Sequence, residues 1–379
     1  MPWKVETVMS RRKELVTLAL SEGANMSELC RREGVSRKTG YKWLRRYREE
    51  GDCGLHDLTR RPHRSPNRTR DDMEQVVVSL RREHPTKGAH VLAQMLKNRR
   101  YDPVPSKSTV TAILRRHGLI DPAESTKHQP YKRFEHEEPN QLWQMDFKGH
   151  IAIGSGGRCH PLTLLDDHSR FSLGVKACSN ERSETVQGHL TSIFRHYGMP
   201  NTMLVDNGSP WGHDLDHPFT PLTVWLIQLG VRVVHSRPYH PQTLGKLERF
   251  HRSLKAELLQ GRTYRDLAHC QSSFDRWRDF YNLERPHHAL DLDIPANRYS
   301  MSSRPFPEPL PALQYDIDDQ VRKVDVNGRI SFRGRPFRVG KAFKGKPVAL
   351  RPTTTDGLWD VFFSLQPVAN ISLASPDVE

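Results

Sequence analysis

The chain has 379 residues and a net charge of +14, which favours an anionic partner such as nucleic acid. No apolar run approaches the ~20 residues that span a bilayer, and the first residues lack the apolar segment of a signal peptide, so we expect a soluble, cytoplasmic protein. The five cysteines are far apart in sequence, which excludes a CxxC zinc knuckle or redox pair and fits a reducing compartment.

The excess positive charge is concentrated near the amino terminus. Residues 1–137 contain 29 basic and 18 acidic side chains, a net charge of +11, and the remaining 242 residues have a net charge of only +3. A generic solvated basic surface is the alternative to a nucleic-acid-binding region here.

Residues 1–57 contain a pattern of helix, tight turn and helix. Gly34 supplies the turn and Ser36 can cap the second helix. We expect the second helix to carry the following basic residues on its outer surface: Arg37, Lys38, Lys42, Arg45 and Arg46. The pattern indicates a helix-turn-helix with a recognition helix for the major groove, although an ordinary charged helical hairpin would look the same.

A basic, proline-interrupted linker at 58–70 and a second helical unit at 71–125 follow. The linker arginines could lie along DNA phosphates or enter a minor groove, or the segment could be a solvated tether; they are Arg60, Arg61, Arg64, Arg68 and Arg70. The second unit has three amphipathic segments and predicts another helix-turn-helix, of winged-helix-like form. Two such units would suit a long DNA site.

From residue 138 the pattern changes to strands and helices. Three strands in succession, followed by alternating helix and strand to about residue 290, predict a mixed α/β domain. A proline-rich boundary at 282–313 precedes a β-rich tail at 314–373, which we expect to form a small all-β barrel with Asn327-Gly328 at the centre of a hairpin.

Two aspartates stand out within the α/β region. Asp146 lies inside the mostly apolar strand LWQMDF, where a carboxylate is costly without a partner or a metal. Asp206 ends the apolar strand MLVD and is followed by the turn Asn207-Gly208. Ligands of open α/β sheets bind at the carboxyl ends of strands, so Asp206 is a candidate site residue.

Glu248 is the single acid in RPYHPQTLGKLERFHRSLK, among seven Arg, Lys and His side chains. The apolar residues of this helix share one face at i, i+3, i+7 and i+11: Leu247, Phe250, Leu254 and Leu258. Glu248, Arg252 and Lys255 fall on another face. An i,i+4 ion pair with Arg252, worth only ~0.3–0.5 kcal/mol, and a metal-ligand role both remain open from periodicity alone.

A family resemblance rests on four sequence motifs that occur in this order: WQMDF, LVDNGSPW, RPYHPQTLGKLERFHRSLK and YNLERPHHAL. They resemble the catalytic core of retroviral integrases and related insertion-sequence transposases over roughly residues 138–290. With helical units ahead and a small β domain behind, the chain resembles the IS481 branch of these transposases. The resemblance implies a multidomain protein: all-α helix-turn-helix units, an RNase H-like α/β core and a small β-barrel.

The resemblance also implies chemistry. The family's Asp-Asp-Glu triad falls on Asp146, Asp206 and Glu248, which would hold two Mg²⁺ ions, with Mn²⁺ as a substitute. The chain would cut transposon ends to free a 3′-OH and join it to target DNA, and Lys255 matches the position that contacts the DNA end. The neighbouring bases expected to hold phosphates are Lys246, Arg249 and Arg252.

The expected partners are double-stranded DNA, as transposon ends and target, and further copies of the chain on that DNA. The expected location is the bacterial cytoplasm, in association with the nucleoid. No membrane or nucleotide cofactor is expected, since no GxxxxGK[ST] is present. A catalytically inactive, sequence-specific DNA-binding regulator and an RNase H-like nuclease acting on RNA or branched DNA are the alternatives.

Two departures from the family pattern affect these expectations. Asp206 and Glu248 leave 41 intervening residues, more than is usual, and the extra length falls in PWGHDLDHPFTP, which contains Asp214 and Asp216. The His-His-Cys-Cys zinc domain of retroviral integrases is missing, so the helical units would recognise the DNA ends.

Other polar residues compete for a functional role. For Asp166 and Asp167 we favour a turn at a strand end with Arg170 as ion-pair partner over a catalytic pair. Glu257 lies on the same helix as Glu248 but at the wrong place for the match. For Arg285 and His287 we favour structural roles over DNA contact.

Overall fold

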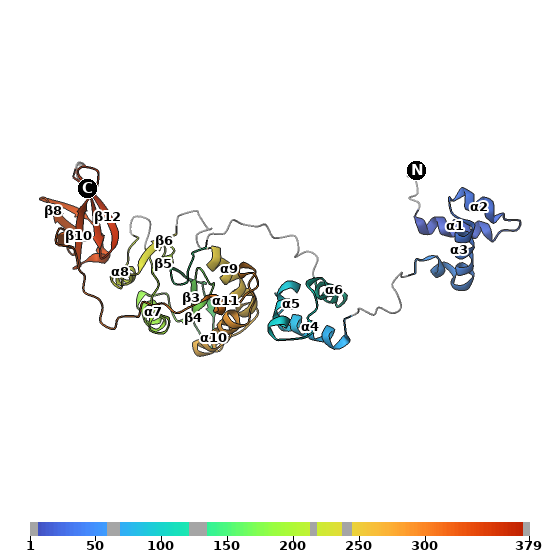
Figure 1. Cartoon of the computed structure of the whole chain (residues 1–379), viewed down its shortest axis with the longest axis horizontal. Coiled ribbons are helices and arrows are strands. Elements are labelled where there is room, and N and C mark those ends of the chain that lie inside the picture. Colours follow the sequence, from blue (N-terminus) through green and yellow to red (C-terminus); the bar gives the residue numbers. More distant parts are fainter. Residues whose placement is uncertain (1–6, 59–68, 121–134, 213–217, 237–244, 374–379) are drawn as a thin grey trace. The chain divides into compact units, whose positions relative to one another are not determined.

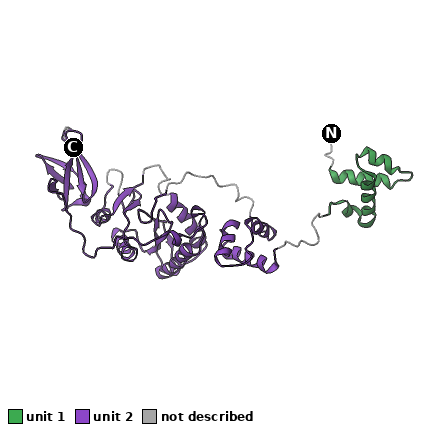
Figure 2. Ribbon diagram, in the orientation of Figure 1, with its two compact units in different colours: residues 1–68 green, residues 69–379 purple. Residues whose placement is uncertain are grey.

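The computed structural model describes residues 7–58, 69–120, 135–212, 218–236 and 245–373. The chain forms two compact units, residues 1–68 and 69–379 (Figures 1 and 2). No helix in these described ranges has both the length and the apolarity that a membrane crossing requires.

The first unit is a small helical domain. It contains α1 (Val8–Ala19), α2 (Met26–Arg32), α3 (Arg37–Glu50) and a 3-10 turn (Gly51–Leu55). The Ser36 hydroxyl accepts the Thr39 N–H at 3.2 Å, and Gly34 has a φ of +65°, so the predicted cap and turn are confirmed. The buried core consists of Val16, Met26, Cys30, Trp43, Leu44 and Leu55.

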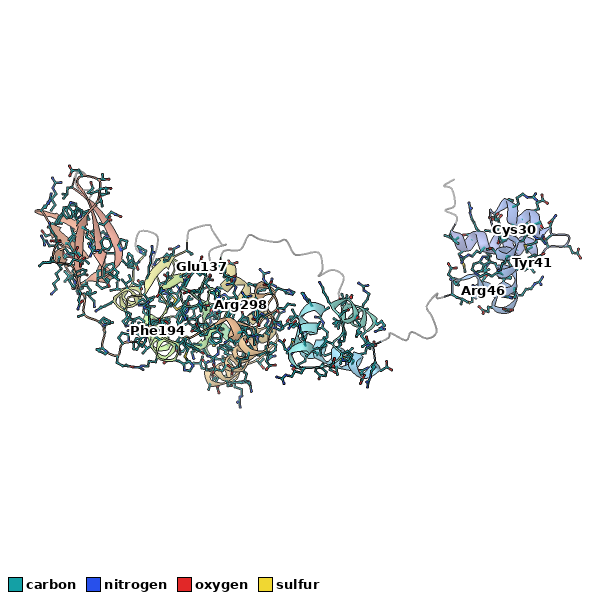
Figure 3. The ribbon with its side chains drawn as sticks, in the orientation of Figure 1. Cys30, Tyr41, Arg46, Glu137, Phe194 and Arg298 are labelled. Carbon is teal, nitrogen blue, oxygen red and sulfur yellow. The ribbon has the colours of Figure 1, made fainter. Side chains whose placement is uncertain are left out.

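One basic residue of α3 does not lie on the outer surface as predicted. Arg46, labelled in Figure 3, is buried. Its guanidinium donates to the His56 carbonyl at 2.8 Å and lies 5.0 Å from the centre of the Trp43 ring. The helix turns this side chain inward because position 46 lies one turn after the buried Trp43.

The second helical unit consists of α4 (Asp71–Glu83), α5 (Ala89–Asn98) and α6 (Lys107–Arg116). Its core is formed by apolar residues at helical spacing: Val77, Val78, Leu80, Val91, Leu92, Met95, Leu96, Val110, Ile113 and Leu114. The described residues of this unit, 69–120, contain no strand and hence no wing, and residues 121–125 lie outside them.

The α/β core has six strands: β1 (Leu142–Phe147), β2 (Ile151–Ala152), β3 (Arg158–Asp166), β4 (Ser172–Cys178), β5 (Thr202–Val205) and β6 (Arg232–His235). The path through the sheet is β2-β3-β1-β5-β6, with β4 also paired to β3. β1 is antiparallel to β3 and parallel to β5, and β5 is parallel to β6. Four strands precede α7 where three were predicted, because the stretch expected as the first strand is divided into β1 and β2. The predicted alternation of helix and strand after them is confirmed.

Helices cover both faces of this sheet. α7 (Ser183–Tyr197) and α8 (Pro221–Gln228) pack on one face, with Leu190, Phe194 and Leu222 in its core. α9 (Gly245–Leu254) and α10 (Leu267–Leu283) pack on the other face, and a π-helical turn (Lys255–Leu259) continues α9. A 3-10 turn (His288–Leu290) and the short α11 (Pro295–Arg298) follow α10.

The tail forms a small β domain, as expected, from two sheets. β7 (Gln320–Lys323), β10 (Pro347–Pro352), β11 (Leu358–Phe363) and β12 (Gln366–Ser372) form the order β12-β11-β10-β7, and β8 (Arg329–Phe332) pairs with β9 (Arg335–Arg338). A 3-10 turn (Lys341–Phe343) lies between β9 and β10.

The expected position of the hairpin is wrong. Asn327-Gly328 connects β7 and β8, which belong to different sheets. The two-residue hairpin loop is Arg333-Gly334, with φ values of +49° and +77°, between the paired residues Phe332 and Arg335. Positive φ at both loop residues matches the right-handed twist of the strands, so this turn closes the hairpin.

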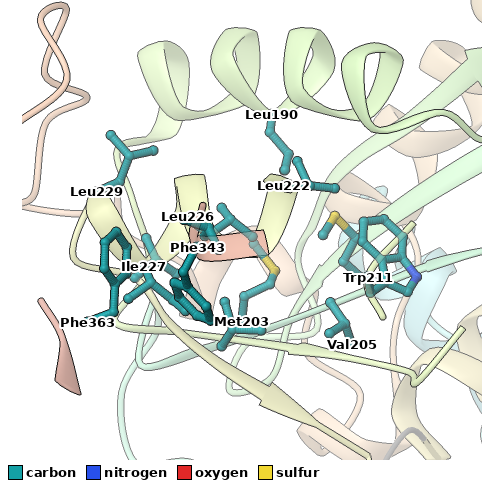
Figure 4. Close-up of a cluster of buried hydrophobic side chains, with 14 of the residues drawn as sticks. Leu190, Met203, Val205, Trp211, Leu222, Leu226, Ile227, Leu229, Phe343 and Phe363 are labelled. Carbon is teal, nitrogen blue, oxygen red and sulfur yellow. The ribbon is translucent and has the colours of Figure 1, made fainter. Parts of the chain in front are cut away.

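Residues of the β domain join the core of the α/β domain. Phe343 and Phe363 lie in the same buried cluster as Leu226 and Ile227 of α8 (Figure 4). The rings of Phe343 and Phe219 meet edge to face with centroids 5.2 Å apart. The β domain is thus packed against the α/β core by apolar contacts.

Side-chain amides cap both edges of the core sheet. Gln366 of β12 accepts the Val233 N–H and donates to the Val233 carbonyl of β6, both at 2.9 Å. At β4, Gln271 of α10 bonds the Ala177 N–H at 2.9 Å and the Val175 carbonyl at 3.1 Å. These amides satisfy backbone groups that an uncovered edge would offer to another chain.

Candidate functional site

Asp146 lies on the face of the sheet that α9 covers. It pairs with Thr163 of β3, and the neighbouring residues Met145 and Phe147 belong to or pack on the core of the opposite face. Its Oδ1 accepts the Phe147 N–H at 2.8 Å. Strand alternation therefore puts this carboxylate on the side of α9.

Asp206 follows the end of β5, next to Asp146. β1 and β5 are parallel, with Gln144 opposite Leu204, so continuing this register by two residues brings Asp146 opposite Asp206 on the same face. The Asp206 Oδ1 accepts the Gly208 N–H at 3.0 Å, which stabilises the turn expected after this strand. The two aspartates thus come together from adjacent strands.

The pKa values of both aspartates are raised, chiefly by burial. Burial, and then the negative charge of Asp206, raise the pKa of Asp146 to about 7. Burial also raises the pKa of Asp206, against the Gly208 N–H and His235, which lower it. Glu181 contributes a third negative charge that raises both pKa values.

Glu248 is exposed in the first turn of α9. The helix buries Leu247, Phe250, Leu254 and, beyond its end, Leu258, at 0–3% exposure, so the predicted apolar face is confirmed. In the described part of the chain no ion pair joins Glu248 to Arg252, and no three His, Cys, Asp or Glu side chains are grouped closely enough to hold a metal ion. The structure thus brings Asp146 and Asp206 together but does not group Glu248 with them.

Hydrogen bonds attach α9 to the strands on both sides of Glu248. The Leu247 N–H donates to Gln144 Oε1 at 3.2 Å, and His251 Nε2 lies 2.7 Å from Thr163 Oγ1. Burial, with the charge of Lys148, lowers the pKa of His251 to about 3, so this imidazole is neutral at physiological pH.

Sequence reasoning missed Gln144, Thr163 and His251. Gln144 lies two residues before Asp146 and therefore on the same strand face, and His251 lies one turn after Glu248, so strand and helix periodicity could have drawn attention to both. Thr163 could not be found in this way, because its position opposite Asp146 depends on the pairing of β1 with β3.

Three of the bases expected to hold phosphates, Arg249, Arg252 and Lys255, are exposed. Lys246 lies differently: its ammonium is 2.5 Å from the buried carboxylate of Asp167 and 3.1 Å from the Asp167 carbonyl. This position favours an ion-pair role for Lys246 over a phosphate contact.

The neighbouring acids have structural partners. Asp166 accepts the Asn140 N–H and the Ser169 N–H, each at 2.8 Å, which fits the expected turn at the end of β3. Arg170 pairs with Glu135 at 2.8 Å, so the expected ion pair with Asp166 or Asp167 is wrong. The fold brings Glu135 from a distant segment to this guanidinium.

Glu257 and Arg285 form an ion pair at 3.2 Å, and His287 is buried against the Tyr281 ring. These positions favour the structural roles expected for Arg285 and His287. Asp214 and Asp216 lie outside the described residues.

The expected DNA-contacting residues of the first unit divide into two groups. On α3, four basic side chains are exposed: Arg37, Lys38, Lys42 and Arg45. The linker residues Arg60, Arg61, Arg64 and Arg68 lie outside the described residues, whereas Arg70 donates to Asp72 at 2.8 Å just ahead of α4.

Matches to protein families cover the chain in order. Residues 11–63 match a family described as helix-turn-helix domain and residues 39–114 one described as homeodomain-like domain. Residues 136–241 and 229–295 match two families described as integrase core domain. Residues 319–379 match the C-terminal domain of IS481 family transposases.

Similar curated proteins come from bacterial insertion elements. The chain is 26% identical over 158 residues to the IS407 uncharacterized 31.7 kDa protein of Burkholderia multivorans, covering 42% of this chain and 54% of that protein. It is 22% identical over 221 residues to the putative transposase for IS5376 of Geobacillus stearothermophilus, covering 56% and 54%. The chain thus spans about half the length of the curated relatives it matches.

Solved structures with some likeness include retroviral integrase cores. The catalytic core domain of BIV integrase is 18% identical, with a TM-score of 0.31, over 42% of this chain and 92% of that one. The HTLV-2 integrase catalytic core domain in complex with magnesium is 16% identical, with a TM-score of 0.32, over 43% and 99%.

The sheet topology described above is that of an RNase H-like integrase core, with antiparallel strands followed by parallel strands and helices on both faces. Helix-turn-helix domains precede this core, and the family-specific β domain follows it. The chain thus contains, in this order, helix-turn-helix domains, an integrase core domain and the C-terminal domain of IS481 family transposases.

Proposed function

We propose that the chain is a DNA transposase that cleaves transposon ends to free a 3′-OH and joins this group to target DNA by metal-dependent phosphoryl transfer. The observation that carries the proposal is the pair Asp146 and Asp206, which lie next to each other at the ends of adjacent parallel strands of an integrase core. Their raised pKa values indicate a site that favours a positive charge.

The residues of the site fit a hard divalent cation. Carboxylate oxygens are the ligands that Mg²⁺ prefers, and the two aspartates, one with a pKa of about 7, are stabilised in their ionised form by such a charge. Asp146, Asp206 and Glu248 would hold two Mg²⁺ ions, for which Mn²⁺ can substitute. When bound, the ions stabilise the negative charge that develops on the attacking and leaving oxygens of the phosphate.

Glu248 would complete the set from α9. Its carboxylate lies on a helix that is attached to β1 and β3 by hydrogen bonds on either side of it. The exposed bases Arg249, Arg252 and Lys255 continue along the same helix and its π-helical extension. They would hold DNA phosphates in line with the carboxylates.

The helical units would recognise the DNA sequence of the transposon end. The exposed α3 residues Arg37, Lys38, Lys42 and Arg45 would contact a major groove at the transposon end, and the linker arginines Arg60, Arg61 and Arg64 would follow the backbone. Pairing of two transposon ends requires at least two chains on DNA, so the active form would be a homo-oligomer.

A strand-transfer assay tests the proposal. Purified full chain, Mg²⁺ or Mn²⁺, labelled DNA carrying the element's own ends and a supercoiled target would be incubated, with Glu248→Gln and Asp146→Asn in parallel. Glu184→Gln is the matched control, because Glu184 is an exposed glutamate in the first turn of α7, on the opposite face of the sheet.

We expect joined products from the wild type and from Glu184→Gln, and a loss of at least about 100-fold in both site variants with DNA binding retained. Specific DNA binding with no cutting or joining by the wild type, with either metal, would overturn the transposase proposal in favour of a DNA-binding regulator. If Glu248→Gln retains strand transfer and Asp146→Asn loses it, Glu248 is not a residue of the site.

A further inference from the structure

We propose that Thr163 and His251 are positioning residues that set the place of Glu248 relative to Asp146. This inference rests on the proposed function, since it concerns the geometry of the same three carboxylates. The observation behind it is a continuous hydrogen-bonded connection from α9 through β3 to the backbone of Asp146 itself.

The connection has a defined direction. The Thr163 hydroxyl donates its single proton to the Asp146 carbonyl at 2.8 Å, so its oxygen must accept from His251 Nε2 at 2.7 Å. This arrangement requires the imidazole tautomer with the proton on Nε2. Thr163 is fully buried and His251 is 8% exposed, so water does not compete effectively for either bond.

A second bond fastens the other side of Glu248. The Gln144 side chain accepts the Leu247 N–H at 3.2 Å and donates to Asp167 Oδ1 at 2.8 Å, which holds the amide in one orientation. Gln144 lies two residues before Asp146 on β1, and Thr163 lies opposite Asp146 on β3. Both fastening points of α9 therefore belong to the immediate surroundings of Asp146, and Glu248 lies between them in sequence.

Apolar packing alone would not fix Glu248 in this way. Leu247, Phe250 and Leu254 bury one face of α9, but such contacts tolerate small sliding and rotation because they have no direction. Hydrogen bonds at positions 247 and 251 define both the rotation of the helix and its position along β1. Carboxylates that share metal ions need placement within about 0.5 Å, so these bonds matter for the site beyond their effect on stability.

The expected consequence is on metal affinity. Loss of the His251–Thr163 bond would leave Asp146 and Asp206 in place and free Glu248 to move relative to them. Hydrogen-bonded residues that orient metal ligands typically change affinity by 10–100-fold when removed, so we expect about a tenfold weaker Mn²⁺ affinity.

The test uses two pairs of variants in the full chain. Thr163→Val and His251→Leu remove the bond, whereas Thr163→Ser keeps the hydroxyl and His251→Gln keeps an N–H donor at a similar reach. Thr223→Val is the matched control, since Thr223 is also fully buried and donates to a carbonyl, that of Thr220, at 3.0 Å, but on α8 across the sheet.

The readouts are the Mn²⁺ dissociation constant, from the electron paramagnetic resonance signal of free Mn²⁺, the melting temperature without metal, and the strand-transfer rate against Mn²⁺ concentration. We expect Thr163→Val and His251→Leu to weaken Mn²⁺ binding about tenfold and to shift the metal dependence of strand transfer equally. Thr163→Ser and His251→Gln should restore most of the affinity. Thr223→Val should lower the melting temperature alone.

Wild-type Mn²⁺ affinity in both Thr163→Val and His251→Leu, with joining intact, would overturn the positioning role and leave the proposed function standing. The positioning role is also overturned, with the proposed function left standing, if Mn²⁺ affinity falls in proportion to the melting temperature in every variant, including Thr223→Val. A wild type that neither binds Mn²⁺ nor joins DNA would overturn the proposed function and this inference together.

Discussion

Lys87 and Glu257 form a buried ion pair, with Nζ and Oε1 2.5 Å apart, although 170 residues separate them in sequence. Lys87 precedes α5 in the second helical unit, and Glu257 lies in the π-helical turn that follows α9. Arg285 and the Trp277 indole N–H also bind this carboxylate, at 3.2 and 3.1 Å. The pair therefore ties a helical unit to the end of the helix that carries Glu248.

The pair is charged at neutral pH. Burial lowers the pKa of Lys87 to about 8, against the attraction of Glu257. Burial works to raise the pKa of Glu257, but the charges of Arg285 and Lys87 outweigh it, and that pKa is lowered. A carboxylate held in this way is stable in the interior only while its cations remain.

Lys87→Met should therefore loosen the contact between α4–α6 and the core. Removal of one partner of a buried pair costs about 3 kcal/mol, which corresponds to roughly 100-fold faster hydrogen exchange of amides that are protected by this contact. Mass-spectrometric hydrogen exchange on α4 and α10 measures it. Arg195→Met is the control, because Arg195 and Glu308 form an exposed pair at 2.7 Å, and no measurable change is expected there. Equal exchange in wild type and Lys87→Met would show that the pair contributes nothing to docking.

Asp146 should make the metal-free protein less stable as pH rises. Its folded pKa of about 7 lies above the ordinary value for an aspartate, so the folded state binds the proton more tightly, and the free energy of unfolding falls between about pH 4 and pH 7. Asp146→Asn escapes this cost, which is up to about 4 kcal/mol for a shift of this size. Melting curves recorded with a metal chelator should show a higher melting temperature for Asp146→Asn than for the wild type at pH 8.5, and equal melting temperatures at pH 4. Parallel profiles for the two proteins across this range would contradict the pKa of Asp146.

Arg45 and Arg46 are adjacent on α3, but alanine substitutions at the two positions should have different effects. Arg45 is exposed, so Arg45→Ala should weaken DNA binding and reduce the slope of log K against log salt by about 1 without changing stability. Arg46 is buried against Trp43 and bonds the His56 carbonyl, so Arg46→Ala should destabilise the first unit by about 1–3 kcal/mol. Fluorescence anisotropy at several salt concentrations and hydrogen exchange of α3 separate the two effects. A stable Arg46→Ala protein with a reduced salt slope would place Arg46 on DNA instead.

Gln366→Leu should weaken the packing of the β domain on the α/β core. The substitution leaves the Val233 N–H and carbonyl on the edge strand β6 without their partner, at a cost of about 1–3 kcal/mol. We expect faster hydrogen exchange in β6 and β12 and a greater tendency to aggregate through the uncovered edge. The exposed Gln260 gives the control Gln260→Leu. If both variants exchange at the wild-type rate, the Gln366 amide has no part in this interface.

The amino-acid sequence alone determined the features that depend on neighbours within a few residues. The alternation of LWQMDF places Asp146 on one strand face, and the spacing of Leu247, Phe250 and Leu254 defines the buried stripe of α9. The cap at Ser36 and the turn after Asp206 are equally local. These elements could be predicted because helix and strand periods act through adjacent residues.

Only the tertiary structure decided which side chains meet across the chain. Ion pairs join Lys246 to Asp167, Arg170 to Glu135 and Lys87 to Glu257. The pairing of β1 with β3 brings Thr163 opposite Asp146. The order of charges along the chain carries no information about these pairs, because any exposed base could face any acid until the sheet register and the helix packing bring two of them together. A charged side chain that loses its water on burial needs an opposite charge beside it, and this burial exists only after the core has formed.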